Sequence, residues 1–528
     1  MPGSRLALVL HAHLPYVRHP EHDEFLEEYW FYEAAMECYL PLLDVLQRLT
    51  AERVPFGLTL NLSPTLLAMM RDPLLTQRLD RRFGNLLELC EKEIRRHGAP
   101  ATEVRLARFY RARLRRLRAA WEACGRDLGK GFEAIAANGG LELIGCAATH
   151  GFLPFLAVEP AAARAQVAVG ISEFRRHFGH GPKGIWLPES AYYPGVEALL
   201  REQGVGYFLV ESHGLLHADP PPPGTGLPLR THAGLVAFGR DEASAQQVWS
   251  GETGYPGDPW YREFYRDIAF EREARYIRPH LPAGLACSTG LKYWRVTSRG
   301  TAPKRYYGRA KAMERAGVHA EDFVSRCAAS AGPVIVAPYD AELFGHWWFE
   351  GPDWLEELLR RAAGRIRTAT LSECLDVARS TCHRLAFSSW GDKGYGDVWL
   401  NPETDWIYPK LHRMARSMTE MARIRNPDPL IRRALNQAAR ELLLAQASDW
   451  PFLIRRGGAP HYAAMRVNLH ESNFERLAAM IRTGRVQPRI LRRLEGRFCP
   501  FPEIDYRVFR KTRSTQAAAS GAAFEGKR

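Results

Sequence analysis

The sequence lacks any apolar run long enough to cross a lipid bilayer, for which a helix needs about 20 consecutive apolar residues. A signal-peptide pattern is also missing from its start, because Leu6 to Leu10 supplies only five apolar residues before His and Pro follow. These two absences argue against a membrane protein and against a secreted one. We therefore expect no membrane partner.

Cysteine pairs with metal-binding or redox spacing are absent as well. The nine cysteines are scattered, none belongs to a CxxC motif, and their number is odd. Disulfide-stapled proteins usually carry an even number of cysteines, and cytosolic proteins keep their thiols reduced. We interpret these cysteines as reduced thiols and expect a cytoplasmic protein without a metal ion or another cofactor.

No DNA- or RNA-binding motif accompanies the positive charge of the chain. The net charge is +13 and the isoelectric point is about 9.4, which can indicate a nucleic-acid or acidic-glycan partner. The basic residues, however, lie in helical patterns such as Arg105 to Arg118 and Arg489 to Arg497. Such patterns are typical of solvated helix faces. We favour that interpretation and expect no nucleic-acid partner.

What the sequence does contain fits a large enzyme. Its 528 residues suffice for one large catalytic domain with one or two satellites, and 46% hydrophobic with 25% charged residues is typical of a globular protein. Thirteen tryptophans is a high number for this length. Indole faces stack on sugar rings, so this number favours a glycan partner, although most tryptophans lie in protein cores.

Short apolar segments alternate with helical periodicity up to about residue 380. Alternation of this kind is typical of a parallel α/β fold. The pattern predicts seven strands, and seven strands alternating with helices indicate a distorted (β/α)7 barrel over residues 1–400. The strands are centred near residues 8, 58, 143, 187, 208, 286 and 335.

Two further parts of the chain have helical periodicity and no strand pattern. Residues 70–138 predict a helical insertion domain, and residues 401–510 predict a C-terminal helical domain. The small and polar residues 511–528 are expected to form a disordered tail. The proline run from Pro220 to Pro223 predicts an exposed loop.

Two carboxylates lie at corresponding places, each at the end of a predicted strand. Glu189 ends the run that starts at Gly184, and Asp340 ends the run that starts at Pro333. Side chains at the C-terminal ends of barrel strands point into the active-site mouth, and glycosidic bond chemistry needs two carboxyl groups. Either acid alone could be a helix-terminal residue. Their coincidence, with aromatic residues beside both, favours a carbohydrate enzyme.

His11 and His13 end the first predicted strand, and their spacing puts both imidazoles on one face of it. Three interpretations stay open, namely metal ligands as in barrel deacetylases, contacts to sugar hydroxyls, and a structural role. A metal site needs a further ligand at a recognisable spacing, and none follows on the next predicted helix. We favour sugar contact over metal binding.

Five segments together resemble glycoside hydrolase family 57, and most closely its α-1,4-glucan (glycogen) branching enzymes. Each segment alone is a weak signal, but all five occur in the family order, and the resemblance extends from residue 5 to about residue 500. The resemblance implies a (β/α)7 barrel, a helical insertion, a C-terminal helical domain and an α-glucan substrate such as amylose or glycogen. A monomer or small homo-oligomer is expected. The segments are 11–16, 145–150, 186–190, 337–347 and 388–391.

The same resemblance implies roles for single residues. Glu189 would be the nucleophile and Asp340 the general acid/base of a retaining transglycosylase in glycogen biosynthesis. That enzyme cleaves an α-1,4 bond and transfers the chain to a 6-hydroxyl, which forms an α-1,6 branch. The expected substrate contacts are His11, His13, His150, Trp186, Arg266, Gly284, Trp390, Trp399 and Asp449.

One feature departs from the family pattern. Family branching enzymes carry a loop tyrosine near the site, and the corresponding residues 211–240 here contain no tyrosine but the proline run. Tyr255, in the next loop, is a candidate substitute. The balance of branching against hydrolysis is therefore open, with an α-amylase or 4-α-glucanotransferase of the same family as the alternative. A metal-dependent deacetylase and a glycan-binding protein without catalysis are more distant alternatives.

Overall fold

The computed structural model describes residues 4–285, 287–297, 304–330 and 332–511. The chain divides into two compact units, each assembled from separate stretches of sequence. Unit 1 comprises residues 1–60, 69–143 and 241–374, and unit 2 comprises residues 61–68, 144–240 and 375–528. Strands β2 (Leu58–Leu62) and β3 (Leu141–Cys146) each begin in unit 1 and end in unit 2. The predicted tail lies outside the described residues, apart from Lys511.

The sheet of unit 1 is built around β1 (Arg5–Ala12). β1 pairs in parallel with β8 (Val334–Asp340) and with the short β9 (Arg367–Thr368). All residues of β1 after the first are buried, as expected of a parallel strand covered on both faces. The register places His11 directly beside Asp340.

A long helical run follows β1 and contains one π-helical turn. α1 (Glu28–Ala34) continues through the π-turn Ala35–Tyr39 into α2 (Leu40–Ala51). Turns of this kind are rare and occur frequently at functional sites. The further helices of unit 1 outside residues 70–138 are α11 (Glu242–Trp249), α12 (Ile268–Glu271), α13 (Ala274–Ile277), α14 (Arg309–Ala328) and α15 (Gly351–Ala362).

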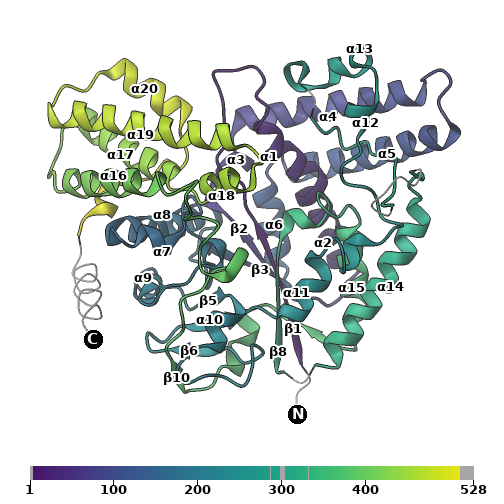
Figure 1. Cartoon of the computed structure of the whole chain (residues 1–528), viewed down its shortest axis with the longest axis horizontal. Coiled ribbons are helices and arrows are strands. Elements are labelled where there is room, and N and C mark those ends of the chain that lie inside the picture. The colour runs from purple at the N-terminus through teal and green to yellow at the C-terminus, as the bar shows by residue number, and fades with distance from the viewer. Residues whose placement is uncertain (1–3, 286, 298–303, 331, 512–528) are drawn as a thin grey trace. The chain divides into compact units, whose positions relative to one another are not determined.

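Three helices fill the predicted insertion, where every residue is described and none is in a strand. They are α4 (Pro73–Ile94), α5 (Ala101–Ala123) and α6 (Leu128–Ala137), and α4 packs along α5 (Figure 1). Asp72 caps α4, because its carboxylate accepts the backbone N–H groups of Leu74 and Leu75. The helical character agrees with the sequence, while the domain boundary stays a prediction.

Unit 2 carries a sheet in the order β3-β4-β5-β7-β6-β10. β4 and β5 pair in parallel with their neighbours, and so does β7 with β5, whereas β6 runs antiparallel to β7. The strands are β4 (Gly184–Trp186), β5 (Tyr207–Val210), β6 (Leu229–Thr231), β7 (Val236–Gly239) and β10 (Cys382–His383). The helices among them are α7 (Leu153–Leu156), α8 (Pro160–Phe178), α9 (Val196–Glu202) and α10 (Ser212–Leu216).

The strand predicted near residue 286 is wrong. Leu285, Cys287 and Ser288 are not in a strand, and Ala286 lies outside the described residues. The prediction missed the short strands β6, β9 and β10, and it also missed β7, which pairs with β5. Both segments have only a few apolar residues, so pairing with a neighbouring strand, rather than local pattern, decides which one becomes a strand.

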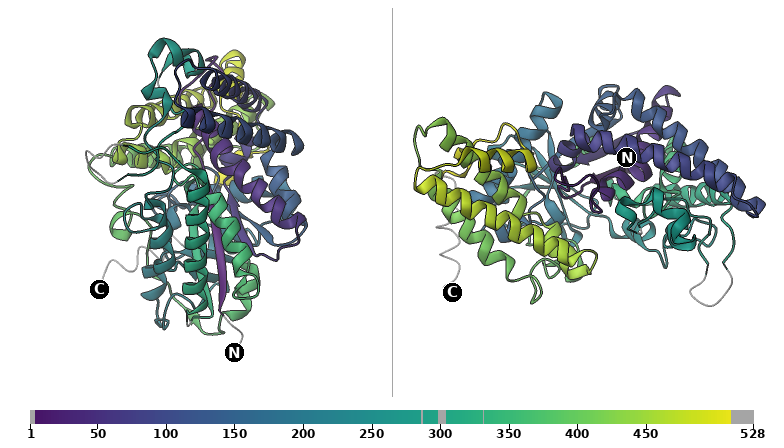
Figure 2. Two further views of the ribbon diagram at one scale, coloured as in Figure 1. Left: turned by 90° about the vertical axis from the view of Figure 1, so that its right-hand side faces the viewer. Right: turned by 90° about the horizontal axis from the view of Figure 1, so that it is seen from above.

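The C-terminal part of unit 2 is helical. Helices α17 and α19 run side by side, as Figure 2 shows, and α18 packs on α19. None of the described helices is long and apolar enough to cross a membrane. The helices are α16 (Ile407–Met421), α17 (Pro429–Ala445), α18 (Asp449–Arg456), α19 (Pro460–Arg482) and α20 (Pro488–Arg497); α3 (Pro64–Met70) follows β2.

Candidate active site

Glu189 lies just after β4 in the short turn Pro188–Ser190, with a backbone φ of 60°. A non-glycine residue in this left-handed region costs about 1–3 kcal/mol, and such residues cluster at active sites where the surroundings hold them. The side chain is almost fully enclosed, with 8% of the residue exposed. The position at a strand end agrees with the sequence, whereas the strained turn had no sequence signal.

Hydrogen-bond donors reach both carboxylate oxygens of Glu189. The indole Nε1–H of Trp390 donates to Oε2 at 2.7 Å, and the hydroxyl of Ser448 donates to Oε1 at 2.6 Å. The backbone N–H of Trp390 also donates to the Glu189 carbonyl oxygen at 3.0 Å. The carboxylate is therefore held in one orientation by charge-assisted hydrogen bonds.

His150 joins the same group in unit 2. Its Nδ1 lies 2.9 Å from Ser448 Oγ and 3.4 Å from Glu189 Oε1. The backbone N–H of Ser448 donates to the His150 carbonyl oxygen at 3.1 Å. His150 is only 2% exposed, so this imidazole is enclosed beside the carboxylate that the sequence predicts as nucleophile.

The predicted tryptophans differ in exposure. Trp186 is fully buried and its ring meets that of Trp390 edge-on, with the centroids 5.3 Å apart. Trp399 is 1% exposed and stacks on Phe152 at 4.9 Å. Trp390 is half-buried. Trp186 and Trp399 are therefore buried rings that pack with Trp390, and their contact with sugar remains a prediction.

Asp449 is the first residue of α18 and is half-buried, next to Ser448. The next residue, Trp450, is fully buried, donates from Nε1 to the Leu444 carbonyl oxygen at 2.8 Å, and lies under the guanidinium of Arg466. Core packing thus fixes the start of α18. The contact of Asp449 with substrate remains a prediction.

In unit 1, Asp340 is the last residue of β8, and His11 is its register neighbour on β1. The imidazoles of His11 and His13 stack with their centroids 5.8 Å apart. The His13 backbone N–H donates to Glu342 Oε1 at 3.2 Å, and Tyr39 of the π-turn donates to the same oxygen. Burial raises the pKa of Glu342. The predicted residues His11, His13 and Asp340 therefore lie together where β1 and β8 end.

Two further acids of unit 1, Glu33 and Glu37, lie on the helical run of α1 and its π-turn. The carboxylate of Glu37 accepts a hydrogen bond from Nδ1 of His346 at 2.9 Å, and His346 follows Asp340 by six residues. Burial opposes ionisation of Glu37, but the His346 hydrogen bond and the charge of Arg262 outweigh it and lower its pKa to about 2. Burial and the negative charge of Glu37 raise the pKa of Glu33 to about 7.

Arg266 and Gly284 are not linked to either group among the described residues. Arg266 is partly exposed, forms an ion pair with Glu271, and lies over the Trp294 ring at 5.0 Å. Gly284 is exposed and has a φ of 72°. Both residues belong to unit 1. Their predicted substrate contacts remain predictions.

Tyr255 does not offer a free hydroxyl in place of the missing loop tyrosine. Its hydroxyl donates to Asp322 Oδ2 at 2.8 Å, its ring stacks on His319 at 4.7 Å, and the residue is buried. Burial raises the pKa of the Tyr255 hydroxyl. The position is a packing contact with α14, so the suggested substitution gains no support.

Sequence reasoning missed Ser448, Glu342, Tyr39 and Glu37. Glu342 lies inside the family-like segment 337–347, and Ser448 directly precedes the predicted Asp449, but no spacing rule separates either from ordinary polar residues. Tyr39 and Glu37 lie in a helix whose periodicity does not reveal the π-turn. Among the described residues, no group of three or more His, Cys, Asp or Glu is arranged to hold a metal ion.

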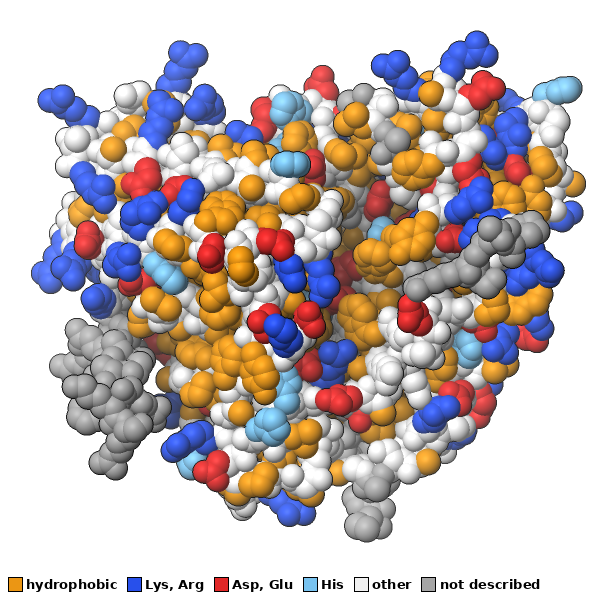
Figure 3. Space-filling model, in the orientation of Figure 1, with side chains coloured by type: hydrophobic (Ala, Val, Ile, Leu, Met, Phe, Trp, Pro, Cys, Tyr) orange, Lys and Arg blue, Asp and Glu red, His pale blue; other side chains and the backbone are white. Residues whose placement is uncertain are grey.

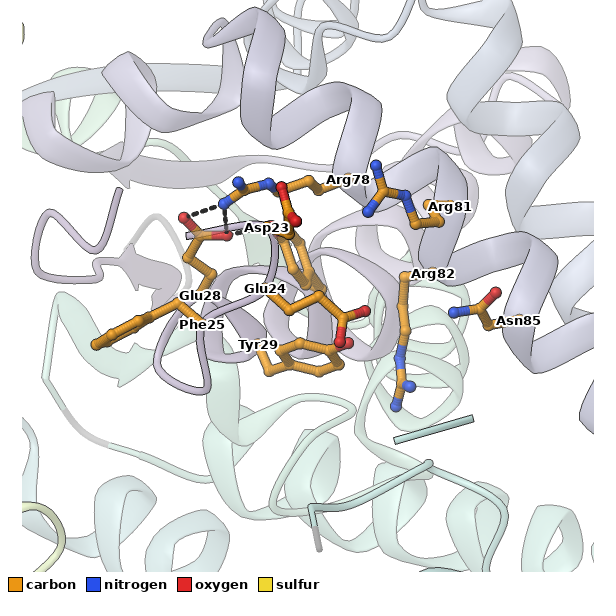
Figure 4. Close-up of a pocket in the computed structure, with 10 residues that line it drawn as sticks. Asp23, Glu24, Phe25, Glu28, Tyr29, Arg78, Arg81, Arg82 and Asn85 are labelled. Carbon is orange, nitrogen blue, oxygen red and sulfur yellow. Dashed lines mark hydrogen bonds and ion pairs between the residues drawn. The ribbon is translucent and has the colours of Figure 1, made fainter. Parts of the chain in front are cut away.

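A charged crevice in unit 1 lies between α1 and α4, with Asp23 and Glu24 on its rim (Figure 4). Arg78 makes two hydrogen bonds of 2.7 and 2.6 Å with the Glu28 carboxylate, and Tyr32 donates to Glu28 at 2.8 Å. These strongly buried charges are therefore satisfied within the fold. The crevice carries no functional assignment.

On the visible face of the described residues, lysines and arginines do not gather into one basic patch (Figure 3). On the face that Figure 3 shows, acidic side chains are interspersed among the lysines and arginines. Many of the arginines form exposed ion pairs, such as Arg433 with Glu495 and Arg413 with Glu471. This mixture is what solvated helix faces present.

Comparison with known proteins supplies the family context of this geometry. The model described as glycosyl hydrolase family 57 matches residues 7–384, and the model described as 1,4-alpha-glucan branching enzyme, C-terminal, matches residues 410–509. The 1,4-alpha-glucan branching enzyme TK1436 of Thermococcus kodakarensis is 35% identical over 94% of this chain and 77% of that protein. The probable 1,4-alpha-glucan branching enzyme Rv3031 of Mycobacterium tuberculosis is 31% identical, covering 92% of this chain and 93% of its own.

Solved structures match nearly the whole chain. The alpha-amylase AmyC of Thermotoga maritima has a TM-score of 0.90 at 38% identity, covering 97% of this chain and all of that one. The branching enzyme TK1436 has a TM-score of 0.86 at 34% identity and covers 97% of both chains. These matches confirm the predicted fold class, an α/β barrel with a C-terminal helical part.

Proposed function

Because the chain belongs to glycoside hydrolase family 57, we propose that it is a 1,4-α-glucan branching enzyme that acts on glycogen-like glucan. The observation that carries this proposal is the joint match of the family model and the branching-enzyme C-terminal model, which together cover most of the chain. Relatives named as branching enzymes also extend over more than nine-tenths of its length. The alternative is hydrolysis, since AmyC is named an alpha-amylase.

The proposed reaction retains the anomeric configuration. Asp340 donates a proton to the glycosidic oxygen while a Glu189 oxygen attacks C1, so that the C1–O4 bond breaks and a glycosyl-enzyme ester forms. Asp340 then removes the proton of an acceptor 6-hydroxyl, whose oxygen attacks C1, and the ester electrons return to Glu189. This scheme requires the carboxyl groups to approach to about 5–5.5 Å in the working enzyme.

Several features support these roles. Glu189 lies on a strained strand-end turn, and donors from Trp390 and Ser448 fix both of its oxygens. Asp340 ends β8, where barrel enzymes carry reacting groups. His11, beside Asp340, and His150, beside Glu189, are enclosed imidazoles that can bond sugar hydroxyls.

Branching requires that an acceptor glucan outcompete water for the glycosyl-enzyme. The residues 211–240 lack the expected loop tyrosine, and Tyr255 is bonded elsewhere. Transfer in this chain therefore relies on other groups that exclude water or hold the acceptor. The absence of the loop tyrosine is expected to affect the ratio of transfer to hydrolysis.

The cellular setting is part of the same proposal. None of the nine cysteines, all of which are described, forms a disulfide. We propose a cytoplasmic enzyme of glycogen biosynthesis, a setting in which thiols stay reduced. We further propose a monomer or small homo-oligomer without a nucleic-acid or membrane partner. The domain boundaries 1–400, 70–138 and 401–510 remain part of this proposal.

Incubation with amylose tests the function. The products are debranched with isoamylase, their chain lengths are measured, and reducing ends are counted in parallel. New debranchable chains with little gain of reducing ends are expected. Reducing ends without new branches would replace the proposal by an α-amylase. Glu189→Gln and Asp340→Asn should each lower turnover by about 1,000-fold or more, and unchanged turnover would refute the site assignment.

A further inference from the structure

We propose that Ser448 is a positioning residue that holds the nucleophile and His150 in one directed hydrogen-bond chain. Its Oγ lies 2.6 Å from Glu189 Oε1 and 2.9 Å from His150 Nδ1. The inference rests on the proposed role of Glu189. It adds a residue from the C-terminal part of the chain to the machinery of glycosyl transfer.

The direction of the chain follows from counting protons. An ionised carboxylate only accepts hydrogen bonds, so the single hydroxyl proton of Ser448 goes to Glu189. Ser448 Oγ then accepts from His150, whose proton must be on Nδ1. Ser448 therefore fixes the tautomer of His150 as well as the orientation of Glu189.

The backbone around Ser448 is anchored independently of its side chain. Its N–H donates to the His150 carbonyl oxygen at 3.1 Å, and Gly151 forms an antiparallel bridge with Ala447. Ser448 is 1% exposed, so water does not compete for its hydroxyl. Because these contacts remain after truncation, Ser448→Ala is expected to lose the hydroxyl without losing the local fold.

The hydroxyl acts differently on the two steps of the reaction. When Glu189 attacks C1, the negative charge leaves its carboxylate, so a donor at Oε1 gives no advantage to ester formation. When the acceptor hydroxyl attacks C1, the C1–O bond to Glu189 breaks and the charge returns to the carboxylate. A donor at Oε1 stabilises that leaving group. Loss of the hydroxyl should therefore slow the second step and lengthen the life of the glycosyl-enzyme.

The test measures turnover and the glycosyl-enzyme in the same variants. Ser448→Ala should lower turnover on amylose about 10- to 100-fold, the range that a hydrogen bond to a charged group implies. Acid quenching and mass spectrometry of the peptide with Glu189 should show a larger glycosylated fraction than in the wild type. Ser448→Thr, which keeps the hydroxyl, should restore both values toward the wild type.

A matched serine separates this role from a structural one. Ser417 of α16 is also buried and accepts a hydrogen bond from Arg482 at 2.7 Å, so Ser417→Ala also loses one buried hydrogen bond. This control should not raise the glycosylated fraction. If the melting temperature of Ser448→Ala is far below that of the wild type, Ser448→Cys is used instead, because its thiol is of similar size but a weak donor. Ser448→Cys should also accumulate the glycosyl-enzyme.

Two outcomes overturn the inference. One is wild-type turnover in Ser448→Ala, and the other is lower turnover without accumulation of the glycosyl-enzyme. Failure of the proposed function is distinguishable from both, because Glu189→Gln would then retain activity. A dead Glu189→Gln variant beside a normal Ser448→Ala variant would refute the role of Ser448 alone.

Discussion

Trp390 holds Glu189 at two points, by its indole Nε1–H on carboxylate Oε2 at 2.7 Å and by its backbone N–H on the carbonyl oxygen at 3.0 Å. The first bond orients the carboxylate. The second secures the backbone of a residue whose φ is 60°. One tryptophan thus stabilises both the side chain and the strained turn of the proposed nucleophile.

Trp390→Phe should lower turnover on amylose about 10- to 100-fold, because it keeps an aromatic ring but removes the donor to Oε2. The melting temperature should change little. Trp406→Phe is the control, since its Nε1 donates to the Glu403 carbonyl oxygen away from Glu189. Equal activities of the two variants would contradict the role of Trp390.

Gly345→Ala should destabilise the protein by more than about 2 kcal/mol and disturb the segment that follows Asp340. Gly345 has a φ of 118°, and an added Cβ would lie 1.8 Å from the Glu37 carbonyl oxygen. Gly364 has a φ of 78° but open space around it, so Gly364→Ala measures the backbone strain alone. Chemical denaturation of both variants should give the larger loss at Gly345.

Glu33→Gln should stabilise the protein above neutral pH. The pKa of Glu33 is raised to about 7, so the wild type loses stability as the pH rises from about 4.5 through 7. The variant lacks this loss and should be more stable by up to about 3 kcal/mol at pH 8, with little difference at pH 4.5. Urea denaturation at both pH values measures the effect. A stability difference of the same size at both pH values would count against this prediction.

His470 should make the C-terminal helices sensitive to acid. Burial lowers its pKa, and its ring lies between Glu441 at 2.7 Å and Arg466 at 3.1 Å, which fits a neutral imidazole. A group with a lowered basic pKa costs stability as the pH falls through the unfolded value of about 6.5. Thermal melts between pH 8 and 5 should therefore show a decline in the wild type. His470→Gln should start lower and decline less.

Removal of metal ions should leave the activity unchanged. The two carboxyl groups account for the proposed chemistry without a Lewis acid. Dialysis against EDTA followed by the amylose assay is expected to give the turnover of the untreated enzyme. Loss of activity that zinc restores would instead favour the deacetylase-like use of His11 and His13.

The parts of the site that the sequence predicts are those that strand patterns and family segments mark. Asp340 ends β8 and Glu189 follows β4, as the apolar runs before them indicate. His11 lies beside Asp340 because β1 and β8 pair in parallel, a register that follows once both strands are recognised. Local pattern is sufficient in these cases because the residues sit on regular elements.

Other parts depend on contacts distant in sequence. Ser448 reaches Glu189 across 259 residues, and a serine before a helix has no pattern that reveals such a partner. The π-turn Ala35–Tyr39 has the composition of an ordinary helix. The strand β7 forms where β5 provides a partner, whereas the apolar residues near 286 have none among the described strands.

The hydrogen bonds from Trp390 and Ser448 have an evolutionary consequence. The match to the family 57 model ends at residue 384, and both donors to Glu189 come after it. A gene truncated at that boundary would still encode both proposed catalytic acids, but not the groups that orient the nucleophile. Recombination that exchanged the chain after residue 384 would therefore have to preserve these two side chains, so that part of the chain cannot diverge independently of the chemistry.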